Sequence, residues 1–194
     1  MEKGSYYLFM GCGSHKQTGN ATLADLVQEF RNGQSKCPYG ELAGYPNIPL
    51  ETALVMAGRA DDGHGHCHPH QWRLWDSTAH EAETILLQNI NRIAACKDFD
   101  SLHNLVKKIL NIPGAGEMYW YDTAFRIGIN LRIYPGKVYL HRGTRDGAKN
   151  LGLPFEKDAL EISELPQELQ KLKPHQTEDF LCIYKDFLRG CKSS

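Results

Sequence analysis

The sequence predicts a mainly α-helical fold with room for one short strand near its beginning. Several segments carry apolar residues at the i, i+3, i+4, i+7 spacing that forms one buried stripe on a helix. Glycine and proline residues separate these segments. Only two runs, residues 5–10 and 138–140, suit short strands. Over 194 residues we expect a single helical domain, with an N-terminal part (1–96), a central part (97–153) and C-terminal helices (154–194).

The first part of the chain alternates helices with loops. The strand at 5–10 leads into a glycine-rich loop, and a helix then opens at Asn20 or Thr22 and ends at Asn32-Gly33. Its apolar face consists of Leu23, Leu26, Val27 and Phe30. Residues 34–47 form a Gly/Pro-rich loop, and Pro49 suits the first turn of a helix that runs to about residue 59.

A polar Gly/His loop at 61–68 precedes the next helical region. Pro69 opens one long helix, or two, that extends to about Cys96. The residues expected to face inward are Leu86, Leu87, Ile90 and Ile93.

The central part begins with a strongly patterned helix. Asp100 is expected to cap it. Its buried stripe consists of Leu102, Leu105, Val106, Ile109 and Leu110. A glycine turn at 112–116 follows, and a second helical pattern opens near Asp122. Beyond Pro135-Gly136 we expect the short apolar run 138–140, a helix near 144–151, and helices after Pro166 and Pro174.

Composition narrows the class of protein. The formal net charge is −1, so any contact with nucleic acid must come from a local positive patch. No run of about 18 apolar residues predicts a transmembrane helix, and the first residues have no apolar core of signal-peptide type. The six cysteines are scattered, which favours a reduced cytoplasmic protein over a disulfide scaffold.

The turn Ile112-Pro113-Gly114-Ala115-Gly116 carries the functional argument. A Gly-x-Gly turn before a helix leaves backbone N–H groups without partners, and such donors bind anions such as a DNA phosphate. Glycine also has no side chain to hold a sugar-phosphate backbone away. We therefore expect Gly114, Ala115 and Gly116 to contact DNA. The alternative is an ordinary helix connection with a glycine C-cap.

The segment 100–153 resembles the helix-hairpin-helix DNA glycosylase superfamily. The family's hairpin, Leu-Pro-Gly-x-Gly, is similar to residues 112–116. The segment Thr123-Ala124-Phe125-Arg126-Ile127 looks like the helix that follows that hairpin, and residues 140–153 can be laid on the family's catalytic stretch, which also ends near Ala-x-x-Leu-Gly-Leu. The resemblance implies a helix-hairpin-helix, glycosylase-like fold and hydrolysis of the N-glycosidic bond of a damaged or modified base.

The sequence departs from the family at the catalytic position. His141 stands where the family has its aspartate, and the only Asp-Thr pair of the region is Asp122-Thr123, soon after Gly116. Either Asp122 has taken over the chemistry, or His141 has, or the activity is absent. We favour Asp122 with His141 assisting, because a carboxylate stabilises the oxocarbenium-like sugar that base excision creates. The alternative for Asp122-Thr123 is a helix cap.

Two further groups of residues are candidates for substrate contact. Tyr119, Trp120 and Tyr121 offer rings on which an extruded base can stack, although any of them also suits the core. A small basic patch that suits phosphate groups consists of Arg142, Thr144, Arg145 and Lys149. A solvated helix face is the alternative for that patch.

The His-rich segment 64–71 is the second unusual feature. Four imidazoles and Cys67 lie within seven residues there, with Cys37 and His80 as the nearest further ligands. The spacing does not suit a regular metal site, and no metal or other cofactor is expected. We expect instead that this loop places His68, His70, Gln71 or Arg73 against the substrate, since His and Gln carry both donors and acceptors. The alternative is an ordinary surface or capping role.

Three functions follow from these residues. The first is a DNA glycosylase, in repair or in antiviral defence against phage DNA. The second is a non-catalytic helix-hairpin-helix DNA-binding protein, and the third is a His-rich metalloprotein. We expect DNA as the partner, no membrane association and a monomeric protein.

Overall fold

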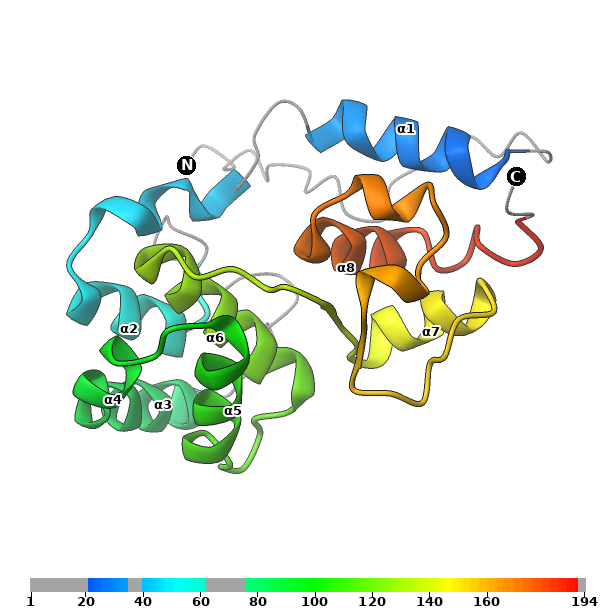
Figure 1. Ribbon diagram of the computed structural model, residues 1–194. Coiled ribbons are helices and arrows are strands. Elements are labelled where there is room, and N and C mark those ends of the chain that lie inside the picture. Colours follow the sequence, from blue (N-terminus) through cyan, green and yellow to red (C-terminus); the bar gives the residue numbers. More distant parts are fainter. Residues whose placement is uncertain (1–20, 35–39, 62–75, 192–194) are drawn as a thin grey trace, which may run out of the picture.

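The helices and the small sheet found among the described residues form two lobes (Figure 1). The structure, a computed structural model, describes residues 21–34, 40–61 and 76–191. Over these residues the prediction of a mainly α fold is confirmed. In chain order the elements are α1 (Leu23–Gln34), η1 (Gly40–Asn47), α2 (Leu50–Gly58), α3 (Asp76–Gln88), α4 (Ile90–Ala94), α5 (Phe99–Ile109), α6 (Glu117–Leu131), β1 (Val138–Tyr139), α7 (Arg142–Asn150), β2 (Ala159–Leu160), η3 (Ile162–Glu164), η4 (Leu169–Lys171) and α8 (Pro174–Ile183).

The first lobe contains η1 and α2 to α6, which surround one hydrophobic core. The buried stripe predicted for α5 is present, with Leu102, Val106 and Leu110 completely buried. The two helices α5 and α6 pack side by side as an antiparallel pair joined by residues 110–116. This pair forms one wall of the site described below.

The second lobe combines α1 with the last third of the chain around a separate core. The ring of Phe30 on α1 packs edge-on against Phe180 on α8, with 5.7 Å between the ring centroids. The lobes therefore do not follow the division of the chain at residues 96 and 153, because α1 packs with elements more than 100 residues later.

A close helix crossing fixes α7 against α8. A side chain at Gly147 would place its Cβ 2.1 Å from the carbonyl oxygen of Leu181, so only glycine allows this approach. The crossing holds the beginning of α7, which follows His141, beside Glu178 on α8.

The beginnings of α5 and α6 correct two expectations. Asp98, not Asp100, caps α5: its Oδ1 accepts a hydrogen bond of 2.7 Å from the backbone N–H of Ser101. Helix α6 begins at Glu117, directly after the glycine turn, and not near Asp122. Asp122 and Thr123 lie in its interior, so their interpretation as a helix cap was wrong.

Smaller elements were also missed or lie elsewhere. Residues 40–47, expected as loop, form η1. The apolar run at 138–140 does contain a strand, β1, which pairs antiparallel with β2 in the register Val138–Leu160. The region before Cys96 contains two helices, α3 and α4. The strand expected at 5–10 and most of the Gly/His loop lie outside the described residues. Among the described helices, none has the length and apolar character that crossing a membrane requires.

Candidate functional site

A cleft of about 290 Å³ lies where the two lobes meet. The first lobe contributes residues from α5 and from the first turns of α6, which are His103, Asn104, Lys107, Glu117, Trp120 and Tyr121. The second lobe contributes residues around β1, the start of α7 and β2, which are Lys137, Tyr139, Leu140, His141, Arg145, Asp158, Ala159 and Glu161. Its volume is close to the lower end of the range for small-ligand sites, roughly 300 Å³.

His141 is the residue of this cleft with the most specific environment. It is the N-cap of α7, and its side chain is only 6% exposed. Its ring Nε2 hydrogen-bonds to Oε1 of Glu178 on α8, whose side chain is 9% exposed. The other ring nitrogen, Nδ1, is buried and has no hydrogen-bond partner within the described part of the chain.

The backbone around His141 is held separately from its ring. The hydroxyl of Thr144 accepts a hydrogen bond of 2.7 Å from the N–H of His141 and donates to its carbonyl oxygen. Burial alone would lower the pKa of His141, but the hydrogen bond and negative charge of Glu178 raise it above its ordinary value. The pKa of the His141 imidazole therefore lies above its usual range, and the charged Glu178 fixes the orientation of the ring.

Tyr121 lies next to His141 and shares an unusual property with it. The two ring centroids are 6.0 Å apart. The Tyr121 hydroxyl is buried and lacks a hydrogen-bond partner among the described residues. Burial, together with the negative charges of Glu178 and Asp179, raises the pKa of Tyr121 well above its usual value. Its phenol therefore keeps its proton and is available as a donor.

The remaining rings of the cleft form an aromatic surface. The centroid of Tyr139 lies 5.6 Å from that of Tyr121 and 4.5 Å from the ring of His103. Burial and the nearby charge of Lys107 lower the pKa of His103 to about 4, so this imidazole is neutral near pH 7. The indole N–H of Trp120 donates to the carbonyl oxygen of Leu110 at 2.7 Å, which fixes the ring at the end of α5.

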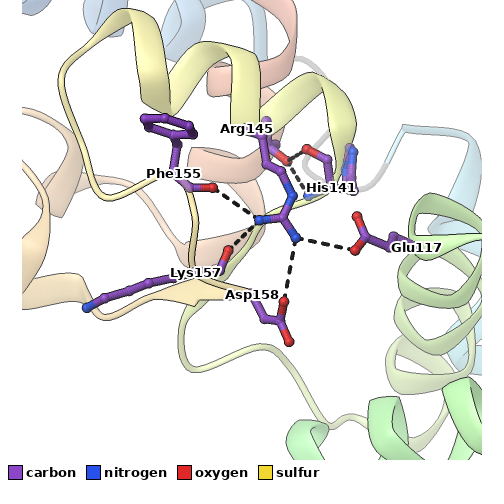
Figure 2. A network of polar contacts seen from close by, with 7 residues as sticks. Glu117, His141, Arg145, Phe155, Lys157 and Asp158 are labelled. Atoms are coloured by element: carbon purple, nitrogen blue, oxygen red, sulfur yellow. Dashed lines mark hydrogen bonds and ion pairs between the residues drawn. The ribbon is translucent and has the colours of Figure 1, made fainter.

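Arg145 connects the two walls of the cleft (Figure 2). Its Nη1 donates to the carbonyl oxygens of Phe155 and Lys157, at 3.1 and 2.6 Å. Its Nη2 lies 3.3 Å from a carboxylate oxygen of Glu117 on α6 and 3.6 Å from one of Asp158. Arg145 therefore organises the loop after α7 and forms an ion pair across the cleft.

The glycine hairpin lies at the end of the first wall. Gly114 has φ +85°, which confirms the need for glycine there, and a side chain would bring its Cβ 2.9 Å from the hydroxyl of Thr78. That hydroxyl donates to the carbonyl oxygen of Pro113 at 3.0 Å. Gly116 differs, because it is the N-cap of α6 in an extended conformation with open space around it. The fold does not require glycine at Gly116.

Asp122, the favoured catalytic residue of the sequence prediction, is half-buried on α6 and does not line the cleft. Its negative charge reaches His141 and Asp179, raising the pKa of both groups. Burial is the main cause of the raised pKa of Asp179, and the charge of Glu178 adds to it.

The other predicted site residues are divided between the core, the cleft and the surface. Tyr119 belongs to the core, with its buried hydroxyl donating to the carbonyl oxygen of Gly58 at 2.6 Å. Thr144 is completely buried, whereas Arg142 and Lys149 are exposed. Ala115 is half-buried in the hairpin.

The His-rich segment 64–71, with His68, His70 and Gln71, lies outside the described residues, as does Arg73. Within the ranges that the structure describes, no group of three potential ligands is placed to hold a metal ion.

Glu178 is the residue that sequence reasoning missed. It lies 37 residues from His141 and next to Asp179, on a helix whose pattern indicated only an apolar face. No local signal distinguishes it from a solvated acidic side chain. No protein-family model, curated protein or solved structure matches this chain, so the assignment of function rests on the cleft.

Proposed function

We propose that this protein is a DNA glycosylase that hydrolyses the bond between a damaged or modified base and its deoxyribose. The observation that carries the proposal is the meeting of two segments at one cleft. The helices joined by the glycine hairpin form one wall, and His141 at the start of α7 lies in the other. These are the two segments that resemble the hairpin and the catalytic stretch of helix-hairpin-helix glycosylases.

The lining of the cleft supports binding of an extruded base. Unstacking a base costs a few kcal/mol, and stacking on an aromatic ring returns about 1–3 kcal/mol. Trp120, which is only half-buried, supplies such a ring, whereas Tyr121 and Tyr139 are 3% and 8% exposed and form the floor of the cleft. The neutral imidazole of His103 and the amide of Asn104 supply donors and acceptors that can read the edge of a base.

The surface beside the cleft supports a contact with the DNA strand. Gly114 and Gly116 are exposed, so a phosphate can approach the backbone N–H groups at the start of α6. Lys107 lines the cleft, and Lys108 on α5 and Arg142 on α7 are also exposed cations. On a chain whose net charge is −1, such individual cations are the groups that can contact phosphate.

The position of His141 favours it over Asp122 as the group that acts on the substrate. His141 lines the cleft and has a negatively charged partner behind it. Asp122 lies on the same helix as Tyr121 and influences the site through its charge. At the position of His141, a general base accepts a proton from water while the bond between the nucleobase and the sugar breaks. Such general base catalysis contributes about 10²–10⁴-fold to the rate.

The decisive experiment is an incubation of the protein with DNA duplexes and single strands that carry different lesions and natural phage modifications. Mass spectrometry detects free bases, and alkaline cleavage detects abasic sites. We expect His141→Asn to abolish release while DNA binding persists, and Asp122→Asn to retain more activity than His141→Asn. Failure of the wild-type protein to release any base from the whole panel would contradict the proposal.

A non-catalytic DNA-binding protein is the second candidate, and the exposed hairpin favours it. Gly116→Val is the informative variant, because the fold leaves open space at that position. Arg92→Ala serves as the control, because Arg92 is an exposed cation on α4 that does not line the cleft. Weaker DNA binding by Gly116→Val alone, without base release by the wild-type protein, would establish this second function.

A further inference from the structure

We infer that Glu178, His141 and Tyr121 form a unit that activates a water molecule in the cleft, with Glu178 positioning His141. The inference deepens the proposed glycosylase function and rests on it. It is based on the burial of three polar side chains that meet between α6, α7 and α8, two of which have an atom without a hydrogen-bond partner in the described chain.

The unpaired atoms are the first step of the argument. A buried polar atom without a partner costs about 1–3 kcal/mol, so native proteins rarely keep one without a reason. Here His141 Nδ1 and the Tyr121 hydroxyl both lack partners, on adjacent residues that line the same cleft. The two rings have their centroids 6.0 Å apart, and a water molecule, which accepts one hydrogen bond and donates another, would satisfy both atoms.

The protonation states give each atom a role. The raised pKa of Tyr121 keeps its hydroxyl a donor. When His141 is neutral with its proton on Nε2, toward Glu178, the lone pair of Nδ1 is an acceptor. A water molecule therefore receives a hydrogen bond from Tyr121 and donates one to His141. Glu178 fixes this tautomer, as the carboxylate does in other acid-histidine pairs.

The reaction step balances without any further reactant. The water oxygen bonds to C1′ of the sugar, and the bond from C1′ to the base nitrogen breaks with its electron pair leaving on the base. His141 Nδ1 takes one proton from the water, and Glu178 stabilises the resulting imidazolium. The released base gains a proton from solvent, and His141 returns its proton to solvent. The products are the free base and an abasic sugar with a 1′-hydroxyl group.

The pH dependence of excision is the first test. The charges that reach His141 are Glu178 on α8 and Asp122 and Glu117 on α6, and all of them raise its pKa. Because the neutral imidazole is the active form, single-turnover excision increases with pH through this raised pKa. Glu178→Gln is expected to shift this increase in the excision rate to lower pH. It is also expected to lower the plateau rate by about ten- to a hundredfold.

Asp179→Asn is the matched control. Asp179 is the next residue on α8, and the raised pKa of His141 comes from Glu178, Asp122 and Glu117 rather than from it. We expect Asp179→Asn to leave the pH at which the excision rate increases unchanged. The inference would be overturned if the wild-type protein, Glu178→Gln and His141→Asn had the same pH–rate profile and the same plateau rate. The glycosylase function would stand in that case.

A second measurement judges the pair without any substrate. Titration of the histidine side chains by ¹H–¹⁵N NMR, with His141→Asn for assignment, gives the pKa of His141 directly. Glu178→Gln is expected to lower that pKa, and Tyr121→Phe to leave it nearly unchanged. If Glu178→Gln leaves the pKa unchanged, the positioning role is wrong even when bases are released. If the pKa decreases but no base is released from any DNA, the proposed glycosylase function fails and the pair itself stands.

Discussion

Tyr121→Phe gives the sharpest test of the site, because it should improve stability while it impairs function. The hydroxyl of Tyr121 is buried and has no partner among the described residues. Its removal takes away a desolvation penalty of about 1–3 kcal/mol, whereas the ring keeps its contacts with Tyr139 and Phe125. The water molecule inferred above offsets part of this penalty, so we expect a gain of about 1 kcal/mol in the free energy of unfolding.

The assay is equilibrium unfolding in urea, with the thermal midpoint as a second measure. A gain of about 1 kcal/mol raises Tm by roughly 2–4 °C for a protein of this length, at an unchanged m-value. The excision rate should decrease in the same variant, because the water loses a donor. Such an exchange of stability for activity is expected where a polar group is kept unsatisfied for a ligand.

Tyr119→Phe is the matched comparison for this prediction. Tyr119 is two residues earlier on α6 and equally buried, but its hydroxyl donates to the carbonyl oxygen of Gly58. The same change there should lower the free energy of unfolding by about 1 kcal/mol or more. A loss of stability in Tyr121→Phe as large as that in Tyr119→Phe would refute the argument that the Tyr121 hydroxyl is unpaired.

Three further predictions concern stability. Gly114→Val should cost about 2–3 kcal/mol because of its positive φ and the contact with Thr78, and Gly116→Val only about 1 kcal/mol as a poorer N-cap; equal midpoints in urea would contradict this. Glu178→Gln should lower the free energy of unfolding more at pH 6 than at pH 9. The raised pKa of His141 adds stability that is complete below about pH 6.5 and is lost as the pH rises through the folded-state pKa of His141. A difference that does not depend on pH would count against the ion pair. Burial lowers the pKa of His175 to about 4, so the free energy of unfolding decreases by up to ~3 kcal/mol as the pH falls from about 6.5 toward 4. In urea unfolding at several pH values, His175→Gln should reduce this decrease. An unchanged pH dependence would show that His175 is not its cause.

Local patterns predicted the helices and the glycine turn because the signals for these are contained in short stretches of sequence. The stripe from Leu102 to Leu110 and the glycine turn at 112–116 were both predicted in this way. The start of α6 was placed too late, because the aromatic residues after Gly116 were interpreted as a pocket before the helix and not as its first turns.

The candidate site was only partly predictable, for a physical reason. His141 was identified because its segment resembles the catalytic stretch of the glycosylase family. Its hydrogen-bond partner Glu178 could not be identified in this way, because only the packing of α7 on α8 brings the two residues together. The same holds for β2, a strand of two residues whose register depends on β1. Contacts between distant segments leave no periodic trace in the sequence, and the site consists mainly of such contacts.

The route of the chain between the lobes has a consequence for the cleft. Helix α1 lies in the second lobe, η1 and α2 to α6 build the first, and the chain then returns to the second, so the first lobe is an insert within the second (Figure 1). The two walls are joined by the ion pair between Arg145 and Glu117 and by Tyr139 of β1, which packs within the core of the first lobe. The position of β1 therefore links the cleft to that core, so a substitution that changes the packing of Tyr139 also changes the shape of the cleft.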